Sequence, residues 1–70
     1  MAFEFEIIKH IKTLSTNDKG WSKELNMVSW NKRAPKYDIR EWDQDHIKMG
    51  KGVTFTEEEI SNLLEGLKEL

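Results

Sequence analysis

The hydrophobic period of the chain changes once, between Phe55 and Ile60, and this change limits the folds open to it. In residues 3 to 7 (FEFEI) apolar and polar residues alternate, which is the period of a half-buried strand. After the change, apolar residues recur at the i, i+3, i+4 and i+7 spacing of an amphipathic helix, at Ile60, Leu63, Leu64 and Leu67. We therefore expect strands first and one helix last, which is an α+β order.

The start of the helix is marked by Thr56 and Glu59. This spacing predicts a capping box, in which the threonine oxygen accepts from the third helical amide and the glutamate reaches back to the cap. Three consecutive glutamates, residues 57 to 59, also suit the positive end of a helix dipole. The sequence predicts a helix over about residues 57–70.

Turn-forming segments divide the rest of the chain into four strands. The segments STNDKG, NKRAP and DQDHIKMGKG are rich in turn residues, and the predicted strands are about residues 3–14, 21–30, 36–43 and 51–55. Residues 8–14 also fit helical spacing; we favour an extended strand with a bulge near Ile8. The expected fold is a curved four-stranded antiparallel sheet followed by one amphipathic helix, as a single domain over residues 1–70.

Alternation along the two central strands predicts which side chains share a face. Leu25 and Met27 fall on one side of their strand and are the expected core pair, with the helix covering that face. The following strand places Tyr37 and Ile39 on the core side. The opposite, open face is expected to carry Trp30, Arg40 and Trp42. Large aromatic residues on an open face indicate a binding surface.

The small size of the chain favours oligomerisation. A chain of 70 residues buries little apolar surface, and this one has no cysteine for disulfides. Its two histidines, His10 and His46, do not complete a zinc site, and Asp43 and Asp45 beside His46 are more typical of a solvated loop than of metal ligands. We expect no metal and no cofactor. The leucines of the helix exceed what one small sheet needs, which predicts a homodimer with Ile60, Leu63, Leu64 and Leu67 at the interface.

The net charge of −2 hides a basic middle segment. Residues 19–51 carry eight Lys or Arg against five Asp or Glu and all three tryptophans, whereas residues 52–70 carry one Lys against five glutamates. Because salt screens exposed charges beyond about 8 Å, a locally basic face attracts phosphates even on an acidic protein.

A basic, aromatic face suits single-stranded nucleic acid, in which bases stack on aromatic rings and cations follow the phosphates. Trp30 and Trp42 are the predicted stacking residues. The polar and cationic residues predicted to contact the nucleic acid are Arg40, Arg33, Lys51, Lys23, Asn26, Lys36 and Lys48. The alternative for the two tryptophans is a cross-strand pair or a second small core. An RNA ligand, and a peptide or protein docked on the same face, stay open as well.

No nucleophile is paired with a base and an orienting group, so the sequence does not indicate an enzyme. The first residues, MAFEFEIIKHIKTL, are acidic where a signal peptide is basic, and their longest uninterrupted apolar run is Ile7-Ile8. We expect a cytoplasmic location, with association with the nucleoid, and no membrane partner.

The segment YDIREWD, followed by KGVTFTEEEI and a leucine-bearing helix, resembles the C-terminal domain of the eukaryotic transcriptional positive cofactor four. That domain has an IDIRE strand with a nearby aromatic, a loop, KGISL-like residues and a helix. Its short bacterial YdbC-type members are more similar, because they open with the same kind of MAFEFEIIKHI strand and match residues 1–70.

The resemblance implies a homodimeric sheet-and-helix domain whose concave channels bind single-stranded DNA in transcription, replication or repair. Arg40 matches the arginine of the family strand and Trp42 the aromatic that follows it. Lys51 matches the lysine before the glycine, and Trp30 the aromatic that closes the preceding strand. The turn near Arg33 is one residue longer than in the family, so no matching residues are assigned there. The resemblance also allows contacts with the transcription or replication machinery.

Overall fold

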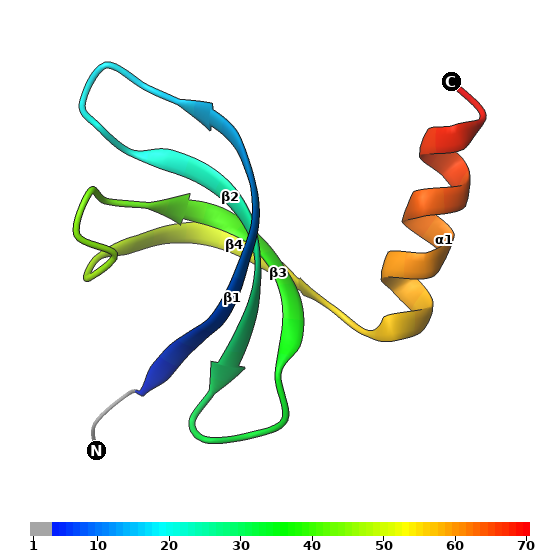
Figure 1. Ribbon diagram of the computed structural model, residues 1–70, viewed down its shortest axis with the longest axis horizontal. Helices are drawn as coiled ribbons and strands as arrows, with labels where there is room; N and C mark the ends of the chain where they lie inside the picture. The colour runs from blue at the N-terminus through cyan, green and yellow to red at the C-terminus, as the bar shows by residue number, and fades with distance from the viewer. Residues whose placement is uncertain (1–3) are drawn as a thin grey trace.

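The computed structural model describes residues 4–70 and contains a four-stranded antiparallel sheet followed by one helix (Figure 1). The strands are β1 (Phe5–Thr16), β2 (Ser22–Trp30), β3 (Lys36–Trp42) and β4 (Met49–Phe55), and the helix is α1 (Glu57–Lys68). The strands lie side by side in chain order, β1-β2-β3-β4. The predicted order of elements is confirmed. The predicted start of the first strand, at residue 3, lies outside the described residues.

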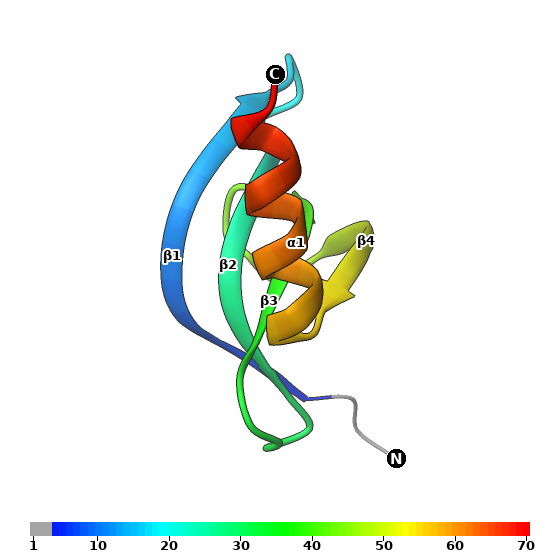
Figure 2. The ribbon, with the colours of Figure 1, turned by 90° about the vertical axis from the view of Figure 1, so that its right-hand side faces the viewer.

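Strand β1 is bent by repeated bulges. Its pairing with β2 shifts register between Ile7 and Lys9, between His10 and Lys12, and between Thr13 and Ser15. The predicted bulge near Ile8 is confirmed, and equivalent bulges occur at Ile11 and Leu14. Each bulge adds one unpaired residue, bends the strand and increases its twist. The strand therefore curves strongly, and the sheet curves with it (Figures 1 and 2).

The fully buried side chains lie on the face of the sheet that we had predicted to be open. We call this the ring face; alternation places Val28, Trp30, Arg40 and Trp42 on it. Val28 and Trp42 are fully buried there, whereas Leu25, Met27, Tyr37 and Ile39, on the opposite outer face, are only half-buried. The predicted grouping of residues by face is correct, but the prediction of which face is covered is wrong, because the bent sheet closes over its ring face.

The helix begins as predicted. Thr56 Oγ1 accepts a hydrogen bond from the Glu59 amide at 3.1 Å, and Glu59 Oε1 accepts one from the Thr56 amide at 2.8 Å, which completes the capping box. The first turn carries acidic residues, as the helix dipole favours.

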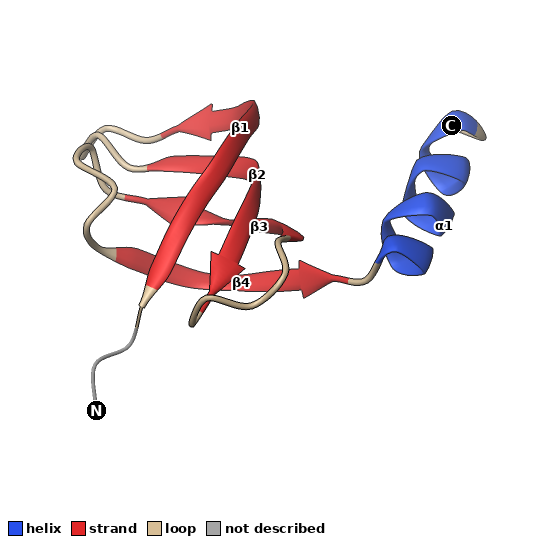
Figure 3. Ribbon diagram, turned by 60° about the horizontal axis from the view of Figure 1, so that its bottom comes forward, coloured by secondary structure: helices blue, strands red, loops and turns tan. Residues whose placement is uncertain are grey.

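The predicted packing of α1 on the sheet is wrong. The helix follows β4 through Thr56, whose extended backbone carries it away from the sheet (Figures 1 and 3). It approaches only β3 and β4, and no residue of α1 is buried. The apolar stripe therefore stays accessible, with Leu64 and Leu67 both 54% exposed.

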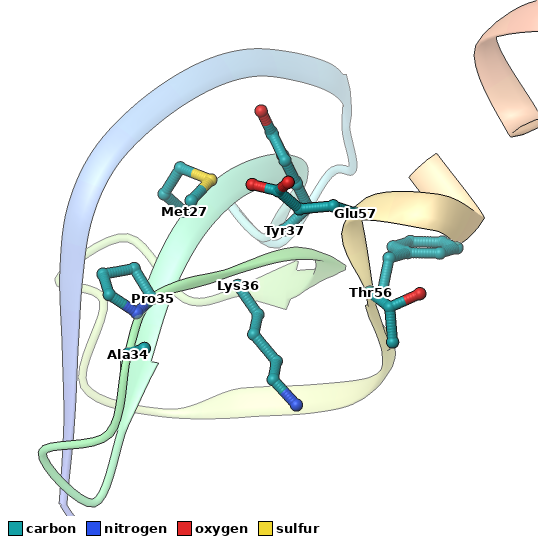
Figure 4. A pocket seen from close by; sticks show the side chains of 8 residues that line it. Met27, Ala34, Pro35, Lys36, Tyr37, Thr56 and Glu57 are labelled. Carbon is teal, nitrogen blue, oxygen red and sulfur yellow. The ribbon is translucent and has the colours of Figure 1, made fainter. Parts of the chain in front are cut away.

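A cavity of about 230 Å³ lies on the outer face, where the sheet meets the start of the helix (Figure 4). Met27 and Tyr37 reach it from the sheet and Glu57 from the helix. Its other lining residues are Ala34, Pro35, Lys36, Phe55 and Thr56. Within residues 4–70 we find no helix with the length and hydrophobicity needed to span a membrane.

Candidate nucleic-acid interface

The ring face is built around Trp30, which ends β2 and is partly exposed. Strand β1 pairs Phe5 directly with Trp30, and their ring centroids are 6.1 Å apart in a tilted arrangement. Asn31 fixes this contact from the turn, because its side-chain oxygen accepts from the Glu4 amide at 3.0 Å and its own amide donates to the Glu4 carbonyl at 2.8 Å. Asn31 and Lys32 both have positive φ, and Arg33 N donates back to the Trp30 carbonyl, as in a tight hairpin turn.

Arg40 covers one side of this aromatic pair. Its guanidinium carbon lies 4.6 Å from the centroid of a Trp30 ring, at cation–π distance. Arg40 Nε and Nη2 donate to the two oxygens of Asp38 at 2.7 and 2.9 Å. Asp38 is fully buried and also accepts from Thr54 Oγ1 at 2.9 Å. Two parallel hydrogen bonds hold the guanidinium plane in one orientation over the indole.

Gly52 makes room for Arg40. The two residues are paired across β3 and β4, and a Cβ atom at position 52 would meet Arg40 Cβ at 2.2 Å and the Ile39 carbonyl oxygen at 2.5 Å. Neither atom is the end of a flexible side chain. The position therefore requires glycine because of close approach.

Trp42 lies on the same face as Trp30 and Arg40, but it is 0% exposed. Phe5 packs against it with ring centroids 5.1 Å apart, and His46 covers it at 5.8 Å. No ring face of Trp42 is open to a base in this structure. The expectation of a second open stacking residue is corrected accordingly, and the alternative of a second small core describes Trp42.

A polar cluster lies on the ring face between Val28 and Trp42, where Glu24 is opposite Arg40 and Asn26 is opposite Asp38. Glu24 is 5% exposed, and its carboxylate accepts from Asn26 Nδ2 at 3.1 Å and lies 3.0 Å from His46 Nε2. Asn26 is fully buried and lies 2.7 Å from His10 Nδ1 through its side-chain oxygen. Asn26, predicted to contact the ligand, thus belongs to a buried hydrogen-bond network.

The loop between β3 and β4 is organised by Asp43. Its Oδ1 accepts from the amides of Ile47 and Lys48 at 2.8 and 3.1 Å, and its carbonyl accepts from the His46 amide. These bonds direct His46 toward Glu24, while its side chain remains 40% exposed. Within the described chain, no group of His, Asp and Glu side chains has the arrangement of a metal site.

The predicted cations do not gather at one place. Arg33 and Lys36 lie exposed at the β2–β3 connection, near the Trp30 end of the sheet. Lys23 is exposed on β2 but alternates with Glu24, so it belongs to the outer face. Lys51 precedes Gly52, which faces Arg40, so alternation places Lys51 on the outer face as well. Lys48 is exposed in the loop before β4. Arg40 lies directly against Trp30, and Lys36 belongs to the ring face because it pairs with Val28.

Three residues that position Trp30 and Arg40 were not among the predicted site residues. Asp38 stands two positions before Arg40 on the same strand, so the alternation that grouped Arg40 with Trp42 also places it beside Arg40. Phe5 and Gly52 depend on the register of strand pairs distant in sequence. No local pattern indicates that register.

Comparison with known proteins identifies relatives of the chain. The model of the family described as Transcriptional Coactivator p15 (PC4) matches residues 17–66. A protein of Treponema pallidum (strain Nichols), described as uncharacterized, is 50% identical over 68 residues, which is 97% of this chain and 80% of that protein. The family match covers β2, β3, β4 and most of α1, and so includes Trp30, Arg40 and Gly52.

Proposed function

Because the chain belongs to the transcriptional coactivator p15 (PC4) family, whose domains bind nucleic acid and are not enzymes, we propose that its ring face binds single-stranded DNA with weak sequence selectivity. The observation that carries this proposal is the geometry of Trp30. Its partly exposed ring lies on a curved sheet face and is oriented by contacts with Phe5 and Arg40. An aromatic ring held in this way stacks on any base, because every base has a π face.

Arg40 contacts the ligand chiefly through the flat face of its guanidinium, and not through hydrogen bonds to phosphate. Two of its nitrogens donate to Asp38, and Nη1 lies 3.5 Å from the Met49 sulfur. Its side chain is only 15% exposed. The guanidinium covers one face of the Trp30 indole, so a base can stack on the exposed part of the indole or on the outer face of the guanidinium.

The phosphates are held from the rim of the ring face. Of the exposed cations predicted to contact the ligand, Arg33 and Lys36 are closest to Trp30 along the chain. Lys23, Lys48 and Lys51 supply positive charge farther from Trp30. Such contacts release counterions from the nucleic acid, so the logarithm of the affinity should fall linearly with the logarithm of the salt concentration.

The ligand-binding form is a homodimer in this proposal. The helix presents Ile60, Leu63, Leu64 and Leu67 as an unburied stripe, and the outer face of the sheet is only half-buried. A second copy of the chain offers the same two apolar surfaces, and burying them together stabilises both chains. The start of the helix lies at the outer face, beside the cavity lined by Met27, Tyr37 and Glu57, so a dimer formed through the helix and the outer face would leave the ring face uncovered.

The cellular role follows from the ligand. A weakly selective single-strand binder acts where duplexes open, in transcription or in replication and repair, and a cytoplasmic, nucleoid-associated location fits this role. Transcription or replication proteins are the expected further partners. RNA is the second candidate ligand, since stacking and phosphate contacts do not depend on the 2′-hydroxyl.

Binding of labelled oligonucleotides tests the proposal. We expect oligo-dT of about 20 nucleotides to bind at micromolar protein and about 50 mM salt, and duplex DNA of the same length to bind more weakly. A parallel titration with oligo-rU of the same length shows whether the protein binds DNA or RNA more tightly. If neither single strand binds under these conditions, the proposal is wrong, and a peptide or protein ligand for the ring face becomes the better account.

A further inference from the structure

The polar cluster of the ring face places two histidines on either side of one buried carboxylate. We propose that binding of single-stranded nucleic acid is coupled to protonation of His10 and His46 around Glu24, so that affinity rises as the pH falls through the range in which imidazoles titrate. This inference rests on the proposed function of the ring face and adds a regulatory property to it.

The geometry of the cluster is direct on both sides. His46 Nε2 lies 3.1 and 3.0 Å from the two Glu24 oxygens. His10 Nδ1 lies 3.5 Å from Glu24 Oε1 and 2.7 Å from Asn26 Oδ1. Asn26 Nδ2 completes the network by donating to Glu24 Oε1 at 3.1 Å. One carboxylate is therefore shared by two imidazoles from segments distant in the chain.

Within the described chain, the permanent cation that faces Glu24 across the sheet is Arg40, its direct partner on β3. The guanidinium of Arg40 is committed to Asp38, so that pair is neutral as a unit. Strand β4 faces Arg40 and Asp38 with Gly52 and Thr54, which carry no charge. Within the described chain, the side chains that can place a positive charge within 4.0 Å of Glu24 are therefore those of His10 and His46. Each does so only when its imidazole is protonated. A carboxylate that is 5% exposed gains most from such a partner.

The charge of this region consequently depends on pH. With neutral imidazoles the cluster carries the single negative charge of Glu24, which repels phosphates. With both imidazoles protonated it carries one net positive charge, which attracts them. An unperturbed imidazole titrates near pH 6.5, within the physiological range.

The ligand can reach both histidines. The side chain of His10 is 49% exposed and that of His46 is 40% exposed, although Glu24 itself is buried. His46 also packs on Trp42 at 5.8 Å, so its position is tied to the aromatic cluster that supports Trp30. Linkage requires reciprocity: if protonation favours the polyanion, binding of the polyanion favours protonation to the same extent.

The sign of the effect follows from this linkage. The complex takes up protons, so affinity should increase as the pH is lowered from about 8 to about 5.5. Two partly exposed charges near phosphates should change the dissociation constant by about fivefold or more over this interval. Oligo-dT is a suitable ligand because neither its phosphodiesters nor its thymines titrate in this range.

Two variants remove the titrating groups while keeping a hydrogen-bond donor. In His10→Asn the side-chain amide takes the place of the Nδ1 donor. In His46→Gln the longer amide side chain takes the place of Nε2, which lies farther from the backbone. The matched control is Thr13→Val, which removes the 3.1 Å contact of Thr13 Oγ1 with His10 Nε2 but leaves both imidazoles. Circular dichroism at each pH verifies that the variants are folded.

The experiment measures the dissociation constant of oligo-dT at fixed ionic strength across this pH interval. We expect the increase toward low pH in the wild type and in Thr13→Val, and its loss in the double histidine variant. The α-amino group titrates in the same range but is retained in every variant. Calorimetry of wild-type binding, in two buffers of different ionisation enthalpy near pH 7, should report proton uptake and does not depend on how the variants fold.

Each result has a distinct meaning. Binding that is independent of pH, without proton uptake, overturns the inference and leaves the proposed function in place. A pH dependence that survives in the folded double variant assigns the coupling to other groups and also overturns it. Absence of binding at every pH removes the proposed function and this inference together.

Discussion

The guanidinium of Arg40 lies over the indole of Trp30, with its central carbon 4.6 Å from the ring centroid. Asp38 sets that position from the same strand, and Gly52 leaves room for it on the next. A buried ion pair therefore orients the aromatic residue that we propose to contact the bases. This relationship connects the stability of the sheet with the function of its ring face, and most of the following predictions depend on it.

Removing the guanidinium should destabilise the sheet. Arg40→Ala leaves the fully buried Asp38 without its cation, and breaking a buried pair in this way lowers the free energy of unfolding by about 3–5 kcal/mol. Arg40→Lys keeps the charge but cannot make two parallel hydrogen bonds, so it should lose less stability while weakening oligo-dT binding. Urea denaturation and binding titrations measure the two effects. Equal stability of Arg40→Ala and wild type would show that the pair does not hold the sheet.

Trp42 should behave as a core residue. Trp42→Ala is expected to lower the free energy of unfolding by about 3–5 kcal/mol, because it removes a fully buried ring packed against Phe5 and His46. Trp42→Phe should cost less, since the indole Nε1 makes no hydrogen bond within the described residues. Thermal and urea unfolding monitored by circular dichroism test this. A folded Trp42→Ala protein of wild-type stability with impaired DNA binding would instead assign Trp42 to the ligand.

Two glycine substitutions should act in opposite directions. Gly52→Ala places a methyl group against Arg40 Cβ and the Ile39 carbonyl, so it should disrupt the β3–β4 pairing and weaken both folding and binding. Gly66→Ala meets no atom within 4 Å and lies within α1, so it should stabilise the helix by about 0.5–1 kcal/mol. The measurement is the unfolding midpoint of each variant. If Gly52→Ala is tolerated as well as Gly66→Ala, the close approach of Arg40 to position 52 is incorrect.

The apolar stripe of α1 should control the oligomeric state. In analytical ultracentrifugation at micromolar concentration we expect a mass twice that of the 8.3 kDa chain. Leu64→Asp puts a charge into the stripe and should give monomers, because a buried unpaired carboxylate opposes association. Asn62→Asp is the matched control, since it adds the same charge on the opposite side of the helix. Sedimentation of the wild type as a monomer would contradict the dimer.

Trp30 should contribute most of the stacking energy. Trp30→Ala is expected to weaken oligo-dT binding by about 1–3 kcal/mol, which is the range for loss of one stacked base. Trp21→Ala is the control, because alternation with Ser22 places Trp21 away from the ring face. Fluorescence anisotropy of labelled DNA gives both affinities. Equal effects of the two substitutions would indicate general destabilisation rather than stacking.

The sequence predicted the order of elements, the helix cap and the grouping of residues by face, because each depends on local spacing. It did not predict which face is buried. The apolar character of Leu25 and Met27 pointed to the outer face, but the repeated bulges of β1 bend the sheet over the opposite one. The apolar spacing and the capping box likewise placed α1 correctly along the chain, but they did not indicate that the helix would leave the sheet uncovered.

The candidate site was predictable to the same degree. Trp30 and Arg40 could be grouped by alternation on neighbouring strands. The burial of Trp42 could not be inferred in this way, because Phe5 reaches it from β1 across the whole of β2. The role of His46 depends equally on the bonds of Asp43 that shape its loop. Long-range register and loop geometry account for the remaining differences.

The most direct test of the account is the fluorescence of a variant in which Trp30 is the only tryptophan, made by the substitutions Trp21→Phe and Trp42→Phe. Titration of this folded variant with oligo-dT at low salt should quench its emission, and the quenching curve should give the same dissociation constant as anisotropy of the labelled DNA. Emission that stays unchanged while anisotropy reports saturation would contradict stacking on Trp30.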